Sequence, residues 1–293
     1  METQIPDWLK TLVRQSKAAL RAERGQETDA AIQSQSLHTV CREARCPNRG
    51  KCFSEGGATF LILGNVCTRG CRFCAVERGR PQPPDADEPA RIAATLRGWK
   101  LRYAVITSPT RDDLPDGGAE QFAKTARTIR EAAPQTLVEP LTPDFAGNMR
   151  SLETVLESRP AALAHNMETV PRLYETVRRG ADYKRSLDLL AHSKKFAPDI
   201  PVKSGIMLGL GETAREIESV LRDLAGIGCD MLTLGQYLAP TKLHAPVERY
   251  PEPAEYDDWK AKALALGFKA VAAGPLVRSS YLAQELYRQL SQI

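Results

Sequence analysis

Short apolar runs rich in β-branched residues alternate along this chain with longer amphipathic segments. Six candidate strands and a weaker seventh lie at 59–65, 102–108, 136–141, 161–166, 202–208, 231–237 and 268–273. They begin 25 to 43 residues apart, and helical patterns between them include 117–132, 146–158, 169–195 and 212–227. Parallel strands joined by right-handed crossovers curl into a barrel or part of one, so the pattern predicts an α/β fold of the barrel type.

Two segments fall outside this repeat. In residues 1–36, apolar side chains at helical spacing predict an amphipathic helix that wraps the barrel or docks a partner: Trp8, Leu9, Leu12, Val13 and Leu20. Residues 80–89 are rich in proline, which predicts an extended surface loop.

Three cysteines follow the first candidate strand closely. Cys67, Cys71 and Cys74 form a C-x3-C-x2-C loop. Three thiolates can hold three irons of a cubic iron-sulfur cluster and leave the fourth iron open to a small molecule. Phe73 precedes the last cysteine, where it is expected to shield the cluster and lie near the bound molecule.

A second run, at Cys41, Cys46 and Cys52, also supplies three thiolates where clusters usually take four ligands. Structural zinc is one alternative, but it normally takes four ligands from two short pairs, and neither run has that spacing. A disulfide framework is another. The lack of an apolar leader at Met1 favours a cytoplasmic location, in which thiols stay reduced.

Composition sets wider limits. The chain has 293 residues, 42% of them hydrophobic and 26% charged, which suits one large globular domain or two small ones. The longest uncharged stretch, 56–68, has 13 residues against the ~20 that span a bilayer, so we expect a soluble protein. Basic and acidic residues are nearly balanced, with a net charge of +4, which does not indicate nucleic-acid binding. A local basic patch would nevertheless suit an acidic protein partner.

The Cys67 loop, including Phe73, resembles the loop of the radical S-adenosylmethionine (SAM) superfamily. With the Cys41 run upstream, the chain resembles lipoyl synthases over residues 40–283. The segments that carry this similarity are 46–48, 58–60, 111–114, 116–119, 165–171, 203–205, 209–213, 235–238, 240–241 and 274–281.

This resemblance implies a partial, six-stranded (β/α)6 barrel at 56–275, an N-terminal extension at 1–55 with the Cys41 run, and a C-terminal extension at 276–293. It implies two 4Fe-4S clusters and SAM as cofactors. The Cys67 cluster would reduce SAM to a 5′-deoxyadenosyl radical twice per product, and the Cys41 cluster would be consumed as the sulfur source. The implied activity is that of a sulfurtransferase of lipoate biosynthesis and protein lipoylation, which inserts sulfur at C6 and C8 of a protein-bound N6-octanoyl-lysine.

In that family the fourth ligand of the second cluster is a serine of the C-terminal Arg-Ser-Ser-Tyr segment. Carried over to this chain, it is Ser279 or Ser280, and we predict Ser280. A hard alkoxide among soft thiolates is the easiest ligand to lose, which would release the first iron as the cluster gives up sulfur. The alternative for a serine pair is an ordinary turn or helix cap.

Barrels of this kind carry their sites at the carboxyl ends of the strands. The SAM contacts predicted there are Phe73, Thr107, Ser108, Asn166, Gly209, Gly211 and Glu212. Apart from Phe73, ordinary turn chemistry is the alternative for each of them. Pro109 departs from the family's pattern and removes an amide donor from the loop after Ser108.

Four other polar or thiol side chains are candidate site residues. Asp112 and Asp113 are predicted either to contact a ligand or to cap a helix. His165 is expected to be a structural hydrogen-bond donor rather than a base. Cys229, isolated in an apolar segment, is expected to be a buried small hydrophobic residue.

The resemblance also implies partners. These are octanoylated lipoyl carrier domains of 2-oxoacid dehydrogenase complexes or the glycine cleavage H protein, an electron donor such as ferredoxin or flavodoxin, and an iron-sulfur carrier that rebuilds the spent cluster. No nucleic acid or membrane partner is expected. Two rival interpretations are another two-cluster radical SAM enzyme, such as a methylthiolase or maturase whose second cluster relays electrons, and a non-catalytic iron-sulfur or zinc protein.

Overall fold

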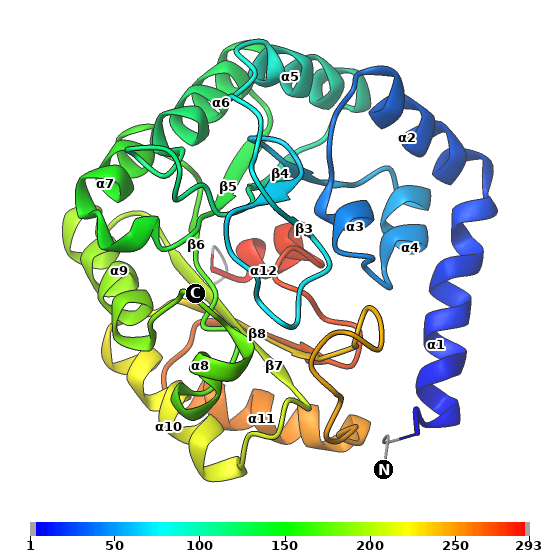
Figure 1. The fold of residues 1–293 in the computed structure, drawn as a ribbon, viewed down its shortest axis with the longest axis vertical. Coiled ribbons are helices and arrows are strands. Elements are labelled where there is room, and N and C mark those ends of the chain that lie inside the picture. Colours follow the sequence, from blue (N-terminus) through cyan, green and yellow to red (C-terminus); the bar gives the residue numbers. More distant parts are fainter. Residues whose placement is uncertain (1–3, 291–293) are drawn as a thin grey trace.

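Seven parallel strands pair in the order in which they occur along the chain (Figure 1). In this computed structural model, which describes residues 4–290, they are β1 (Thr59–Leu61), β4 (Tyr103–Thr107), β5 (Leu137–Leu141), β6 (Leu163–Ala164), β7 (Val202–Leu208), β8 (Met231–Gln236) and β9 (Ala270–Gly274). The sheet curls, but β1 and β9 remain its edges and do not pair with each other. The predicted partial barrel is therefore confirmed, and the weaker seventh candidate also forms a strand.

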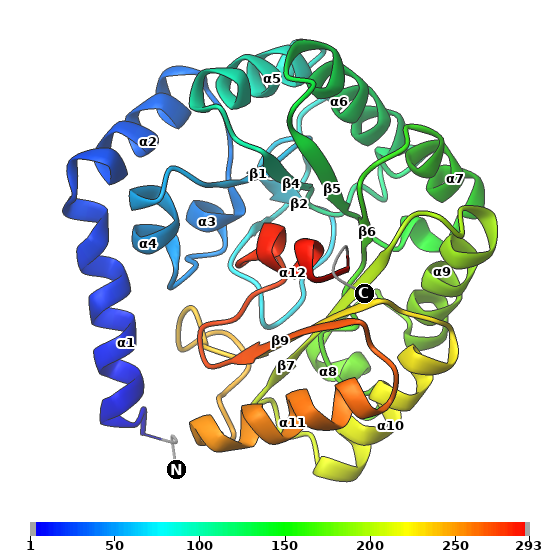
Figure 2. The same cartoon turned by 180° about the vertical axis from the view of Figure 1, so that it is seen from behind.

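Helices cover the outside of the curled sheet (Figures 1 and 2). They are α5 (Glu88–Trp99), α6 (Ala119–Ala132), α7 (Met149–Glu157), α9 (Tyr183–Phe196), α10 (Ala214–Gly226) and α11 (Pro253–Ala265), whereas the short helix α8 (Tyr174–Val177) lies inside this ring in both views. Short 3-10 turns, η2 (Phe145–Gly147) and η3 (Pro171–Leu173), precede α7 and α8. The apolar faces of these helices pack on the strands in two large clusters, one around Phe122 and one around Leu221.

Several expected boundaries were wrong, and two of them have a clear local cause. The continuous helix expected at 169–195 is divided into η3, α8 and α9, because Gly180 turns the chain with a positive φ of 80° and Asp182 caps α9 by accepting from the Arg185 amide at 2.7 Å. The expected loop at 80–89 is shorter, because α5 begins at Glu88 and Pro89 lies in its first turn, where a missing amide costs nothing.

The N-terminal region lies along the open side of the barrel. The expected single helix is two helices, α1 (Asp7–Ala18) and α2 (Glu23–Ser34), joined by the 3-10 turn η1 (Ala19–Arg21), and both continue the outer ring (Figure 2). Two short helices, α3 (Val40–Glu43) and α4 (Arg49–Ser54), then carry the Cys41 run toward the centre. The first three residues of the expected N-terminal extension and the last three of the C-terminal one lie outside the described part of the chain.

The last helix, α12 (Ala283–Leu290), lies at the centre of the ring (Figure 2). Its buried face packs on strands from opposite sides of the barrel, with Leu286 against Met231 and Ala283 against Tyr103. The rings of Tyr287 and Tyr103 lie 5.4 Å apart. This helix thereby closes the interior from one end. Within residues 4–290, no helix combines the length and apolarity needed to cross a bilayer.

Candidate active site

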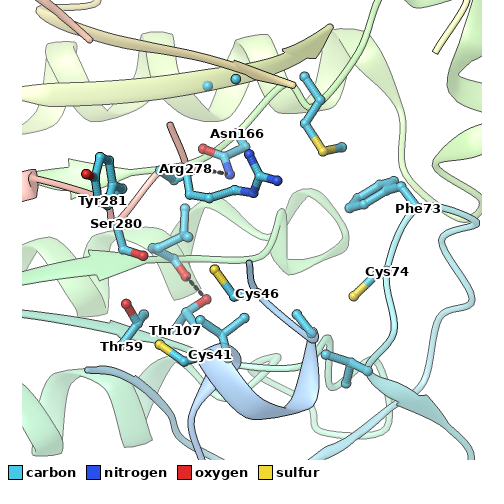
Figure 3. A pocket seen from close by; sticks show the side chains of 18 of the residues that line it. Cys41, Cys46, Thr59, Phe73, Cys74, Thr107, Asn166, Arg278, Ser280 and Tyr281 are labelled. Carbon is cyan, nitrogen blue, oxygen red and sulfur yellow. Dashed lines mark hydrogen bonds between the residues drawn. The ribbon is translucent and has the colours of Figure 1, made fainter. Parts of the chain in front are cut away.

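All six cysteines of the two runs line one cavity of about 1280 Å³ in the interior of the barrel (Figure 3). Strand ends contribute Thr107 and Leu141 to its wall, and the segment after β9 contributes residues 277–285. In sequence, the C-terminal serines lie more than 200 residues after both cysteine runs. The fold therefore brings these distant segments to the wall of the same cavity.

The Cys67 loop is held between two short parallel strands, β2 (Val66–Cys67) and β3 (Glu77–Arg78). On one side the Arg69 guanidinium donates to both Asp112 oxygens at 2.7 Å and lies 2.8 Å from Asp144. On the other side the backbone oxygen of Cys74 lies 3.1 Å from Nε2 of His244. These contacts fix the loop before any ligand binds.

Asp144 has no exposed side-chain surface, so its ionisation depends on Arg69. Burial opposes the charge, but the hydrogen bonds and positive charge of Arg69 outweigh burial and lower the pKa of Asp144 to about 2. Asp112 is thus an ion-pair partner of the cysteine loop. Asp113 likewise pairs with the buried Arg111 at 2.8 Å, so both carboxylates are engaged in ion pairs.

Burial makes four of the cavity thiols poor acids in the absence of a positive partner. Burial and the nearby Cys46 raise the pKa of Cys41 to about 12, and burial raises the pKa of Cys71 to about 11 and of Cys74 to about 12. The pKa of Cys52 is raised for the same reason. Thiolates at such positions require a cation that replaces their protons, as a metal does.

The described residues contain no group of three or more His, Cys, Asp or Glu side chains arranged to hold a single metal ion. A single zinc ion would draw its four ligands to bonds of roughly 2.0–2.3 Å, whereas a cluster of four irons binds each thiolate at a different iron and keeps them farther apart. The cavity that the thiols line is large enough for clusters, and neither run has the paired cysteine spacing of a structural zinc site.

The Cys41 run and the C-terminal segment are joined directly. The Asn48 amide donates to the backbone oxygen of Leu276, and Lys51 Nζ donates to the Tyr281 hydroxyl at 2.8 Å. The segment also passes so close to β8 that a Cβ at Gly235 would overlap the Val277 carbonyl oxygen. Glycine is needed there for this close approach.

The two candidate serines differ in their hydrogen bonds. Ser279 Oγ accepts from the Asn166 amide at 2.6 Å. For Ser280, no side-chain hydrogen bond is found among residues 4–290, and its hydroxyl lies in the cavity on the side of Cys41 and Cys46 (Figure 3). Of the two serines, Ser280 is thus the one whose hydroxyl has no partner among the described residues.

Two buried polar atoms on the cavity wall lack partners among the described residues, Oγ of Ser108 and Oδ1 of Asn166. Unsatisfied buried polar atoms are costly unless a ligand or water pairs with them. By contrast, the Thr107 hydroxyl donates to the Leu141 carbonyl at 2.8 Å and so supports the sheet. Phe73 lines the cavity beside Cys74.

Three predicted SAM contacts are not brought to this cavity as the described residues form it: Gly209, Gly211 and Glu212. The Glu212 carboxylate instead accepts from the backbone amides of Gly209 and Leu210 at 2.7 and 2.8 Å. Gly209 and Gly211 both have φ of 101°, which only glycine adopts easily. In this structure the three residues build a turn, and their role as ligand contacts stays a prediction.

His165 is a structural residue, as expected. Its Nδ1 donates to the Thr142 carbonyl at 2.8 Å, which leaves Nε2 as the acceptor facing Ser186 and Arg178. This tautomer follows from the hydrogen-bond network. Cys229 is buried as expected, with 3% of its surface exposed.

Sequence reasoning missed two residues that line the site. Arg69 lies between two cysteines of the loop, and its position there gives no sequence signal of its ion pairs with Asp112 and Asp144. Arg278 projects into the cavity between Asn166 and Cys46 (Figure 3), and none of the ion pairs found within residues 4–290 includes it. Its position beside the serine pair was the only available signal.

Comparison with known proteins gives consistent matches. A model of the radical SAM superfamily matches residues 61–224. The chain is 55% identical to a lipoyl synthase of Trichlorobacter lovleyi over 94% of this chain and 96% of the relative. It is 50% identical to that of Caldicellulosiruptor saccharolyticus (97% and 98%) and 53% identical to that of Vibrio vulnificus (94% and 85%).

Solved structures with low identity share the fold. A methylornithine synthase covers 92% of this chain and 75% of its own length at a TM-score of 0.56 and 16% identity. A maturase of the FeFe-hydrogenase covers 90% and 62% at a TM-score of 0.54 and 11% identity. These likenesses bear on the fold alone.

Proposed function

This chain belongs to the lipoyl synthase family of the radical SAM superfamily, and from that premise we propose how its own residues carry the reaction. It is a sulfurtransferase of protein lipoylation that uses SAM and two 4Fe-4S clusters to insert two sulfur atoms into an octanoyl chain, at C6 and C8. The proposals concern which residues hold each group and how the cavity controls the chemistry.

The donor set of the cavity fits two clusters and one SAM. Each run offers three thiols, and the Ser280 hydroxyl is available as a fourth ligand beside Cys41 and Cys46. The unpaired Ser108 Oγ and Asn166 Oδ1 are suited to the polar groups of SAM. We assign Cys67, Cys71 and Cys74 to the cluster that binds SAM, and the Cys41 run with Ser280 to the second cluster.

When bound, these groups supply a carbon radical that opens an unactivated C–H bond and the sulfur that replaces the hydrogen. The chain's own residues hold the two thiol sets on the wall of one cavity. Phe73 and the buried strand residues limit access of water to the space between them. Arg69 keeps the Cys67 loop in place through Asp112 and Asp144, so the distance between the two sets is fixed by the protein.

The protein substrate is an octanoylated carrier protein. We propose that it is a lipoyl carrier domain of a 2-oxoacid dehydrogenase complex or a glycine cleavage H protein, that a ferredoxin or flavodoxin supplies electrons, and that an iron-sulfur carrier rebuilds the spent cluster. The many free thiols of the site agree with a reducing compartment such as the cytoplasm.

The single observation that carries these assignments is the common cavity of both cysteine runs and Ser280. The test is anaerobic incubation of the iron-reconstituted protein with SAM, dithionite and an octanoyl-lysyl peptide, followed by mass spectrometry. We expect a peptide that gains two sulfur atoms, with two 5′-deoxyadenosines formed per product. SAM cleavage with no sulfur gained would contradict the proposed roles.

A further inference from the structure

We propose that the edge of the cavity beside α1 is the docking surface for the carrier domain, and that it binds an acidic surface with an apolar patch near the octanoyl-lysine. We call this edge the α1 rim and define it by Lys10, Arg14, Lys17, Arg45 and the apolar side chains Ile5 and Leu243. The inference rests on the proposed function, because it concerns how that substrate reaches the site.

The geometry of α1 presents a basic face to the cavity. Lys10, Arg14 and Lys17 are four and three residues apart and so share one face of the helix, and all three line the cavity. The helix is anchored by the buried Leu9 and by Ser16, whose hydroxyl donates to the Pro47 carbonyl at 2.8 Å. The basic face is therefore fixed relative to the Cys41 run.

The exposed charges around the opening of the cavity are mostly positive. Five of the basic residues that line the cavity are exposed, namely Arg14, Lys17, Arg45, Arg72 and Arg78, against two exposed carboxylates, Glu55 and Glu285. The whole chain is nearly balanced at +4, so this concentration is a property of the opening. A positive edge attracts an acidic partner and raises its association rate.

Apolar side chains are also exposed around this cavity. Of the seven large hydrophobic residues exposed among residues 4–290, three line this cavity: Ile5 (40% exposed), Leu243 (89%) and Leu282 (43%). Apolar groups surrounded by charged ones are typical of protein-protein interfaces. The substrate chain is attached to a protein and must enter from the open edge, so the carrier surface has to lie against these residues.

The test compares two substrates, an octanoylated carrier domain and a short neutral octanoyl-lysyl peptide. The variant is R14E/K17E, and the matched control is R215E/K260E, which reverses two exposed charges on α10 and α11 away from the cavity. We expect R14E/K17E to lower the ratio of kcat/KM for the carrier to that for the peptide about ten-fold. We also expect it to weaken the dependence of the carrier reaction on salt, and the control to change neither.

An unchanged ratio in R14E/K17E, or an equal change in the control, would overturn the docking proposal. A wild-type chain that modifies neither substrate would instead refute the assigned function, so the two failures are distinguishable. Selective binding of the α1 rim to RNA or to anionic vesicles, with no effect on the carrier ratio, would also overturn the proposal.

Discussion

Asn48, two residues after Cys46, donates a side-chain hydrogen bond to the backbone oxygen of Leu276, four residues before Ser280. This bond connects the two segments from which the second cluster would take its ligands. Asn48 is only 2% exposed, so its loss leaves a carbonyl without its donor in a region from which water is largely excluded. Under the proposed assignment, Ser280 is thus positioned by Asn48, which is not itself a proposed ligand.

Asn48→Ala is expected to lower the free energy of unfolding by ~1–3 kcal/mol, because the partner carbonyl loses its hydrogen bond. It should also lower the iron content of the Cys41 site more than that of the Cys67 site, measured by Mössbauer spectroscopy. Gln33→Ala is the control, since Gln33 makes an exposed hydrogen bond to Asp29. Equal iron loss at both sites in Asn48→Ala would refute a specific role in positioning.

Gly235→Ala is expected to displace the C-terminal segment, because the new Cβ overlaps the Val277 carbonyl. The predicted cost is ~1–3 kcal/mol of stability, with sulfur insertion lost while reductive cleavage of SAM is retained. Gly98→Ala is the matched control, since an added Cβ there meets nothing within 4 Å. A Gly235→Ala protein with normal product yield would show that the close approach is dispensable.

Ser280→Ala is expected to reduce iron at the Cys41 site, whereas Ser279→Ala should keep it, because Ser279 already accepts a hydrogen bond from Asn166. Ser280→Cys should bind iron at both sites and yet release sulfur slowly, since a thiolate is a stronger ligand than an alkoxide. Iron analysis and product mass spectrometry measure both effects. Full activity in Ser280→Cys would refute the labile-ligand hypothesis.

The buried His165 is expected to make the free energy of unfolding depend on pH. Burial, together with the charge of Arg178, lowers the pKa of His165 to about 4 in the folded chain, below its ordinary value of 6.5. Between these values the unfolded chain binds the extra proton, so stability falls as the pH falls. Between about pH 7.5 and 5.5 the free energy of unfolding falls by ~1.3 kcal/mol.

The measurement is urea unfolding of the wild type and of His165→Gln under anaerobic conditions at several pH values. The difference between the two proteins removes contributions common to both, including those of the thiols. We expect the wild type to show the extra pH dependence and His165→Gln to lack it. Parallel pH curves would show that His165 is not the group responsible.

The sequence predicted the strands well, because β-branched runs at a regular pitch are a local property. Boundaries failed where single residues leave the strand conformation. β1 was expected to reach residue 65, but it ends at Leu61 because Leu63 and Gly64 have φ of 67° and 84°. Such left-handed positions depend on tertiary contacts that a sequence pattern does not contain.

For a similar reason, the sequence predicted some residues of the candidate site and missed others. The cysteines were recognisable from spacing alone, whereas the nearness of Ser280 to Cys41 came only from the family resemblance. Gly209 and Glu212 resemble a ligand-binding turn in sequence, but in the structure the carboxylate satisfies its own turn amides. For Arg278, the adjacent serine pair was the one local signal, and it did not indicate that the side chain projects into the cavity.

The most direct test of two thiol sets with separate tasks is the triple variant C41A/C46A/C52A, reconstituted with iron and sulfide and given SAM, dithionite and an octanoylated carrier domain. Our account predicts about half the iron of the wild type, continued formation of 5′-deoxyadenosine, and no sulfur in the carrier. Sulfur-containing product from this variant would contradict the account.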